Sequence, residues 1–458
     1  MEAFLIKTLQ LILCFALLIL LHEGGHFFFA KLFKVRVEKF CLFFDPWKSW
    51  KLFSFRGTDY HIGWLPLGGY VKISGMIDES MDVEQMKQPV QPWEFRAKPA
   101  WQRLLIMVGG VLVNFLLALF IYAMILFAWG DTYVPIEKMN DGFKYNEQAH
   151  KLGFRDGDIP LRTDEKTFER YSVDIYRDLS EAHSVTVLRQ GKEMTFALPG
   201  DLDMLKMLKA QPPFIAPLAP AVIDSVAAGS PAARAGIKAG DRLLALNGTK
   251  LETWNEFDVQ MGDINSSLKT YREDNNKTMT DSLSRVTMVV RHAAGPAVPD
   301  TLSLVLDEQG KAGFFKHLPF ADYPKETRTY GFFESFPAGC AHGWDVLCGY
   351  VDDLKYLFTA DGAQSLGSFG TIGSLFPAQW DWLRFWELTA FISLMLAFVN
   401  ILPIPALDGG HVLFLLYEVI TRRKPSDRFL EIAQTIGMWL LFALMAYAIF
   451  NDLLRFVF

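Results

Sequence analysis

The chain has 458 residues, of which 51% are apolar and 14% aromatic, and its formal net charge is -6. A chain of this length accommodates roughly three domains. The small negative charge and the absence of a long basic block argue against a nucleic-acid partner. The four cysteines form no Cys-x-x-Cys pair, so they predict no disulfide framework.

The first predicted element is an apolar run from Phe4 to Phe33, which has two histidines and a glutamate, His22, His26 and Glu23, in its middle. About 20 apolar residues are enough to cross a hydrocarbon core of ~30 Å. A secretory signal is the alternative, because a lysine precedes the apolar stretch. No Ala-x-Ala cleavage site follows, however, and the run continues beyond the polar residues. We therefore predict a first transmembrane helix here.

The polar residues of this run form the motif His-Glu-x-x-His. His22 and His26 are four residues apart and share one face of a helix, from which both imidazoles can reach one tetrahedral zinc ion. Glu23 is then placed to act as a general base towards water at the metal. A charge at bilayer depth costs at least ~2.5 kcal/mol, and no solvent reaches an apolar run, so a solvated helix face does not explain the motif. Gly24 and Gly25 are expected to permit close backbone approach near the metal.

Three further apolar runs predict membrane spans, at Leu104–Trp129, at Phe385–Leu402 continuing to Ile420, and at Gly437–Phe458. Basic residues follow span one, precede span two and follow span three, whereas the opposite flanks are poor in them. Because basic residues near span ends mark the cytoplasmic side, both termini and the long middle segment are expected to lie outside the cytoplasm.

The middle segment contains a duplication. "AHKLGFRDGD" (149–158) and "AARAGIKAGD" (232–241) share Ala, Gly, a basic residue, Gly and Asp at one offset, and both precede sequence typical of β-hairpins. Such repeats indicate tandem copies of one module. From Ala221 to about Leu306 the second copy resembles a PDZ domain, whereas the first copy is degenerate. PDZ domains bind extended peptides by strand addition; the alternative is that these modules are steric bulk or assembly surfaces.

A catalytic zinc needs a third protein ligand. Asp408 is the only carboxylate between Glu387 and Glu418, and prolines and glycines break the predicted helix around it. Broken backbone at membrane depth is tolerated only where it is buried in protein or lines a cavity. His411 is the competing ligand, but Asp408 is preferred because it sits at the break and its charge offsets that of the metal.

"HEGGH" in span one, "NILPIPALDGG" in span three and the PDZ-like modules between them resemble the site-2 protease family of intramembrane metalloproteases. The resemblance is strongest to the bacterial regulator of sigma-E protease branch, which has four spans and tandem extracytoplasmic PDZ domains. It implies that His22, His26 and Asp408 bind Zn²⁺ and that Glu23 is the catalytic base. It also implies that Asn400 hydrogen-bonds the substrate backbone.

The resemblance further implies a membrane-reentrant β-hairpin region around "WLPLGGYVKI", which presents an edge strand to the substrate through Gly68, Gly69, Tyr70 and Val71. Tyr and Val favour strands, and the glycines permit a bend or close approach. An ordinary interfacial hairpin is the alternative. In span two the family commonly has Gly-Pro before an Asn where this chain has Val111, which puts a local kink in doubt.

The expected fold is a polytopic α-helical membrane protein with four transmembrane helices, a reentrant β region and two extracytoplasmic α+β PDZ-like domains. The expected segments are transmembrane helix 1 (1–34), the cytoplasmic-side β region (35–100), transmembrane helix 2 (101–130), the degenerate PDZ-like domain (131–210), the second PDZ domain (211–325), an amphipathic helix and loop (326–384), transmembrane helix 3 (385–420), and a cytoplasmic loop with transmembrane helix 4 (421–458).

The expected function is hydrolysis of peptide bonds within transmembrane segments of proteins that were already shortened outside the membrane. Anti-sigma factors and remnant signal peptides are the substrate types, and the site of action is the bacterial inner membrane, with the PDZ domains and both termini periplasmic. The expected partners are these substrates and the lipid bilayer, with the enzyme acting as a monomer. His61 and His342 are expected to make ordinary polar contacts.

Two rival classes of protein remain at this point. A scaffold with a structural zinc site would be expected to have four ligands rich in cysteine. A metal transporter would be expected to show inverted repeats in the membrane, whereas the repeat here is in the soluble segment.

Overall fold

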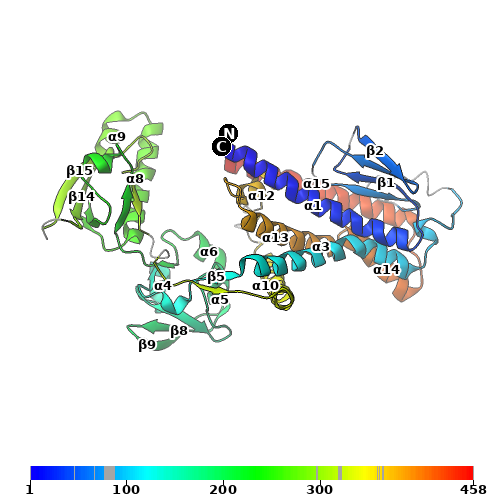
Figure 1. Cartoon of the computed structure of the whole chain (residues 1–458), viewed down its shortest axis with the longest axis horizontal. Coiled ribbons are helices and arrows are strands. Elements are labelled where there is room, and N and C mark those ends of the chain that lie inside the picture. The colour runs from blue at the N-terminus through cyan, green and yellow to red at the C-terminus, as the bar shows by residue number, and fades with distance from the viewer. Residues whose placement is uncertain are drawn as a thin grey trace. The chain divides into compact units, whose positions relative to one another are not determined.

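The computed structural model describes residues 2–45, 47–66, 68–76, 88–294, 298–317, 322–357, 359, 362–363 and 366–456. The chain divides into two compact units (Figure 1). Unit 1 joins Met1–Asp131 to Arg328–Phe458, and unit 2 is Thr132–Thr327. Unit 2 is therefore an insertion between two segments that fold together.

Unit 1 contains four helices that are long and apolar enough to cross a membrane: α1 (Glu2–Leu32), α3 (Ala100–Trp129), α13 (Trp382–Ile401) and α15 (Asp427–Phe456). Helix α3 packs against both α1 and α13. Helix α15 begins earlier than the expected start at Gly437, because the polar residues of its first turns do not interrupt the helix. The hydroxyl of Ser426 accepts a hydrogen bond from the Phe429 amide at 3.3 Å and caps this start.

The third apolar run is broken, as predicted. Helix α13 ends at Ile401, and α14 (Asp408–Thr421) begins after a six-residue connection that contains two prolines. A Cβ at Gly409 would lie 2.1 Å from the Leu402 carbonyl oxygen, and one at Gly410 would lie 2.6 Å from that of Ile404. The two glycines therefore let this connection, called here the 402–407 loop, fold back onto the start of α14.

The segment after α1 forms a mixed sheet of four strands, not a simple hairpin region. Its strands are β1 (Val37–Leu42), β2 (Trp50–Phe55), β3 (Thr58–Ile62) and β4 (Tyr70–Ile73), in the order β2-β3-β1-β4. Strands β2 and β3 form an antiparallel hairpin, whereas β4 pairs with β1. Strand β4, which contains Tyr70 and Val71, lies at the edge of the sheet.

In the second segment of unit 1, helices α10 and α12 precede α13 among the described residues. Helix α10 (Phe332–Leu357) packs on α3, where a Cβ at Gly339 would lie 2.5 Å from the Ala123 amide nitrogen. The short helix α12 (Phe369–Leu375) is held by Asp452 of α15, which accepts hydrogen bonds from Ser368 and Thr371. The Gly/Ser segment around α12 is thus tied to the last helix.

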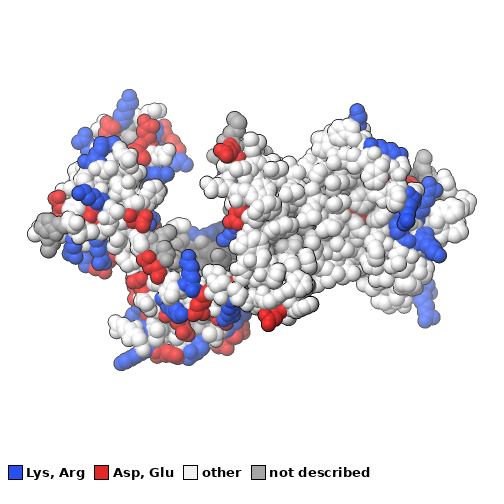
Figure 2. Space-filling model, in the orientation of Figure 1, with Lys and Arg blue, Asp and Glu red and all other residues white. Residues whose placement is uncertain are grey.

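The surface of unit 1 matches a membrane-embedded body. In the orientation of Figure 2, a broad part of this unit shows few charged residues. Lys and Arg side chains gather at the end where β1, β2 and α14 lie (Figures 1 and 2). Unit 2 is densely covered with charges of both signs, as expected for a surface in water.

Unit 2 consists of two modules preceded by a short connection. Strands β5 (Asp131–Tyr133) and β17 (Glu326–Arg328) pair where the chain enters and leaves it. The first module contains β6 (Phe143–Tyr145), α4 (Glu147–Leu152), β7 (Ile159–Thr163), α5 (Asp174–Glu181), β8 (Ser184–Arg189), β9 (Lys192–Ala197), α6 (Met204–Lys209) and β10 (Ile215–Pro217). The second contains β11 (Ile223–Val226), α7 (Pro231–Arg234), β12 (Arg242–Leu246), β13 (Thr249–Lys250), α8 (Trp254–Glu273), α9 (Lys277–Ser284), β14 (Arg285–Arg291), β15 (Asp300–Val305) and β16 (Phe314–Lys316).

The duplicated Gly-Asp turns have the same local structure. Asp158 and Asp241 are both buried, and each accepts a hydrogen bond at 2.8 Å from the amide three residues earlier. The side chain that contacts each carboxylate differs. Arg189 binds Asp158 through two nitrogens at 2.7 Å, whereas His292 contacts Asp241 through Nδ1 at 2.8 Å.

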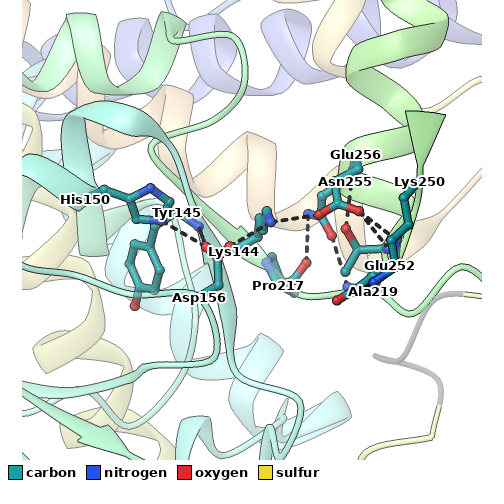
Figure 3. A network of polar contacts seen from close by, with 11 residues as sticks. Lys144, Tyr145, His150, Asp156, Pro217, Ala219, Lys250, Glu252, Asn255 and Glu256 are labelled. Carbon is teal, nitrogen blue, oxygen red and sulfur yellow. Dashed lines mark hydrogen bonds and ion pairs between the residues drawn. The ribbon is translucent and has the colours of Figure 1, made fainter.

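A polar network joins the two modules (Figure 3). Lys144 of β6 contacts Asp156 at 2.7 Å and Glu256 of α8 at 3.0 Å. Burial by itself raises the pKa values of both carboxyls, but hydrogen bonds from Lys144 and nearby amides outweigh it and lower them. Burial lowers the pKa of Lys144, and the two carboxylates outweigh this and raise it. All three groups are therefore held in their charged forms.

Candidate metal centre

Three potential metal ligands converge from two helices of unit 1. Asp408 Oδ2 lies 3.2 Å from His22 Nε2 and 3.4 Å from His26 Nε2. The two Nε2 atoms are 3.3 Å apart. Asp408 is the first residue of α14, and the two histidines are one turn apart on α1. The 402–407 loop thus brings the predicted third ligand to the predicted pair.

The dimensions of this triangle fit a zinc ion. Zn–N and Zn–O bonds of ~2.0–2.1 Å in a tetrahedron imply ligand atoms about 3.3 Å apart. Within the described part of the chain, Asp408 Oδ2 is buried without a hydrogen-bond donor, although two imidazole nitrogens face it. In the same part of the chain, these residues are the only group of three or more His, Cys, Asp or Glu side chains close enough together to hold a metal. His411, the competing ligand, lines the adjoining cavity but does not belong to this group.

The backbone of α3 orients His26. The Nδ1 atom of His26 lies 2.8 Å from the carbonyl oxygen of Ile106. A carbonyl can only accept, so Nδ1 carries the proton and Nε2 keeps its lone pair directed at Asp408 and His22. A hydrogen bond of this kind from the second ring nitrogen is the usual support for a metal-binding histidine.

The side chain of Asn114 lies beside the second ring nitrogen of His22. Its amide nitrogen Nδ2 is 3.3 Å from His22 Nδ1, and its buried Oδ1 has no hydrogen-bond partner among the described residues. The two ends of an amide are exchanged by a half-turn of the side chain, which would place Oδ1 against Nδ1. In that orientation Oδ1 would accept the Nδ1 proton, and His22 Nε2 would be free as a ligand.

Close packing of α1 on α3 makes these contacts possible. A Cβ at Gly25 would lie 2.3 Å from the carbonyl oxygen of Gly109, whereas a Cβ at Gly24 would meet nothing within 4 Å. A Cβ at Gly110 would lie 2.4 Å from His26 Nε2. The expected close approach therefore depends on Gly25 and on two glycines of α3, and Gly24 has no part in it.

A cavity of about 110 Å³ adjoins the three ligands. Glu23 lines it, together with Asn400 from the end of α13 and three residues of the edge strand region, Gly69, Tyr70 and Val71. Gly68 is not part of the lining; its missing side chain makes room for the ring of Phe44, 2.4 Å from the position of a Cβ. Of the predicted substrate-binding residues, the structure gathers all but Gly68 around one space.

Three residues near the site were not assigned a role by the sequence analysis: Gly110 and Asn114 of α3, and Gln434 of α15. Gly110 and Asn114 are four residues apart, so they share one helix face. Their role could have been suspected from the sequence, because a glycine and an asparagine four residues apart are unusual in an apolar run. Gln434 is one of several polar residues in the first turns of α15, and nothing in the sequence sets it apart.

The chain is similar to known proteins over nearly its whole length. The chain is 29% identical to "Protease RseP" of Yersinia pestis and to a "Putative zinc metalloprotease" of Vibrio cholerae, over 97% of this chain and of each relative. It is 29% identical to "Regulator of sigma-E protease RseP" of Escherichia coli over 99% of this chain and 100% of the relative. The model of "Peptidase family M50" matches residues 10–444. The family resemblance of the sequence motifs is thereby confirmed: this chain belongs to peptidase family M50, the site-2 proteases.

Proposed function

We propose that this protein is a zinc-dependent protease that hydrolyses peptide bonds inside the membrane, in transmembrane segments of proteins already shortened on the extracytoplasmic side. The observation that carries the proposal is the triangle of His22, His26 and Asp408 beside a cavity among apolar helices. The names of several relatives refer to control of sigma-E, which favours anti-sigma factors as substrates. Remnant signal peptides have the same single-span chemistry.

In this proposal His22, His26 and Asp408 hold the zinc ion. Zinc bound there supplies the positive charge that polarises a carbonyl and makes water more acidic. The carbonyl of Ile106 keeps the Nε2 lone pair of His26 available for it, and the amide of Asn114, turned so that Oδ1 faces Nδ1, does the same for His22. The carboxylate offsets part of the charge, which matters where no bulk water screens it.

The remaining residues of the cavity act on the proton and on the substrate. Glu23 accepts a proton from the attacking water and donates it to the leaving amine. The amide of Asn400 hydrogen-bonds the substrate backbone near the scissile bond. A helix hides its peptide bonds in its own hydrogen bonds, so the substrate must first be unwound. Strand β4 supports this step, because an edge strand can pair with an extended segment through Gly69, Tyr70 and Val71.

The modules of unit 2 are proposed to be PDZ domains on the extracytoplasmic side that exclude substrates with intact ectodomains. The basic end of unit 1 is then cytoplasmic, and both chain termini lie on the same side as unit 2. If a variant without unit 2 still binds zinc but leaves untrimmed substrates uncut, the exclusion role is wrong.

The direct test is cleavage of a tagged single-span substrate with a trimmed ectodomain by the purified protein in detergent. Wild type is compared with Glu23→Gln, and zinc content is measured in both. Cleavage by wild type only, with zinc present in both proteins, supports a hydrolytic site with Glu23 as the base. Zinc in both proteins with no cleavage of several such substrates would favour a scaffold that has lost the activity.

A further inference from the structure

The 402–407 loop has an unusual backbone conformation just before the third ligand. Ala406 has a φ of +79°, a region that residues with a Cβ rarely adopt. Asp408 follows two residues later, so the conformation at Ala406 sets the direction in which the chain enters α14. Strained residues of this kind persist only where surrounding contacts hold them.

The last helix supplies such contacts. Gln434 of α15 is 7% exposed, and its side-chain Oε1 accepts a hydrogen bond of 3.2 Å from the Ala406 amide. One turn later, a Cβ at Gly437 would lie 1.9 Å from the carbonyl oxygen of Pro405. Helix α15 therefore touches two consecutive loop residues, one through a side chain and the other through close backbone packing.

These contacts stand out because α15 is otherwise sparsely packed. In its most apolar stretch of 18 residues, 17% of the residues are buried, which is the smallest fraction among the four long helices. A buried amide in an apolar helix is costly unless it is hydrogen-bonded. The bond to Ala406 gives Gln434 a specific partner, and the same residue lines the cavity beside Asp408.

We propose that Gln434 is a positioning residue for the metal centre. By holding Ala406 in the left-handed conformation, it aims Asp408 at His22 and His26 and so sets the affinity for zinc. This inference rests on the proposed function, because it assigns the three residues as zinc ligands. Gln434 itself touches neither the metal nor the reacting bond in this scheme.

The test measures zinc affinity of the purified full-length protein by competition with a chelator, and the thermal midpoint of the metal-free protein. Gln434→Ala is expected to weaken zinc binding on the order of 10- to 100-fold, as supporting contacts of metal ligands do. Gln434→Glu keeps the acceptor oxygen and is expected to retain the affinity. The control is Thr435→Ala, whose hydroxyl bonds within α15 to Glu431 at 2.8 Å and does not reach the loop.

A second variant separates positioning from general stability. Glycine adopts positive φ without strain, so in an Ala406→Gly background the loss caused by Gln434→Ala should shrink. If Gln434→Ala does not fold, Gly437→Ala disturbs the same loop from the neighbouring turn and should show the same loss of zinc affinity.

The outcomes separate the two proposals. Unchanged affinity in Gln434→Ala, an equal loss in Thr435→Ala, or no restoration by Gln434→Glu would overturn the positioning role. The proposed function is unaffected by any of these results as long as wild type binds zinc and His26→Ala does not. If wild type binds no zinc at this site, both proposals fail.

Discussion

The packing of α1 on α3 predicts opposite effects for two adjacent glycines. Substituting Gly25 by Ala places a Cβ 2.3 Å from the Gly109 carbonyl oxygen, and ordinary contact begins at 3.4 Å. Because the obstacle is backbone, the two helices must separate by about 1 Å, and overpacking of this kind costs ~1–3 kcal/mol. Gly24→Ala meets nothing within 4 Å. Both variants gain the same ~1 kcal/mol of helix propensity, so their difference isolates the packing term.

The assay is thermal or denaturant unfolding of the full-length protein in detergent, with zinc affinity measured in parallel. Gly25→Ala is expected to be less stable than Gly24→Ala by ~1–3 kcal/mol. It should also bind zinc on the order of 10-fold more weakly, because separation of the helices stretches the hydrogen bond between His26 and Ile106. Equal stability and equal zinc affinity of the two variants would refute the proposed role of this helix contact.

Three other predictions follow from contacts described above. Asn114→Leu should lower zinc affinity on the order of 10-fold in chelator competition, and unchanged affinity would contradict its role in orienting the imidazole. Lys144→Met should destabilise unit 2 by ~1 kcal/mol at neutral pH, against less for the exposed control Lys151→Met. The two carboxylate partners of Lys144, Asp156 and Glu256, have lowered pKa values, so the stability difference between the Lys144 and Lys151 variants should vanish as the pH falls through these pKa values. A stability difference that persists in acid would contradict this. Arg189→Ala leaves the buried Asp158 without its cation and should cost about 3 kcal/mol in unfolding experiments, and a loss below 1 kcal/mol would show that the pair is not essential.

The three candidate metal ligands could be chosen from the sequence because each of them is marked by a local pattern. The spacing of His22 and His26 follows from the helical period, and Asp408 follows from the scarcity of carboxylates in a broken apolar run. Four long apolar helices were also predictable, because length and composition suffice. The start of α15 was placed too late, because isolated polar residues in its first turns resembled an end of the apolar run.

Features that depend on a partner from another helix were not predictable. Gly24 and Gly25 are the same residue type at adjacent positions, yet only Gly25 faces the backbone of α3. The bond between Gln434 and Ala406 joins residues 28 positions apart, and no local pattern marks it. The strand order of the β1–β4 sheet was not predicted for the same reason. Strand β4 pairs with β1, which is distant in sequence, and not with β3, which precedes it along the chain.

The length of the edge strand has a consequence for which proteins can be cut. Strand β4 has four residues, and at ~3.3 Å per residue it can pair with a segment of about 13 Å. Under the proposed strand addition, a transmembrane helix therefore has to unwind by little more than one turn to enter the site. Because main-chain groups would make that pairing, substrate selection would depend more on how readily the turn unwinds than on which side chains it carries. A substitution that stiffens the substrate helix at that turn should then protect it, even where the residues flanking the scissile bond are unchanged.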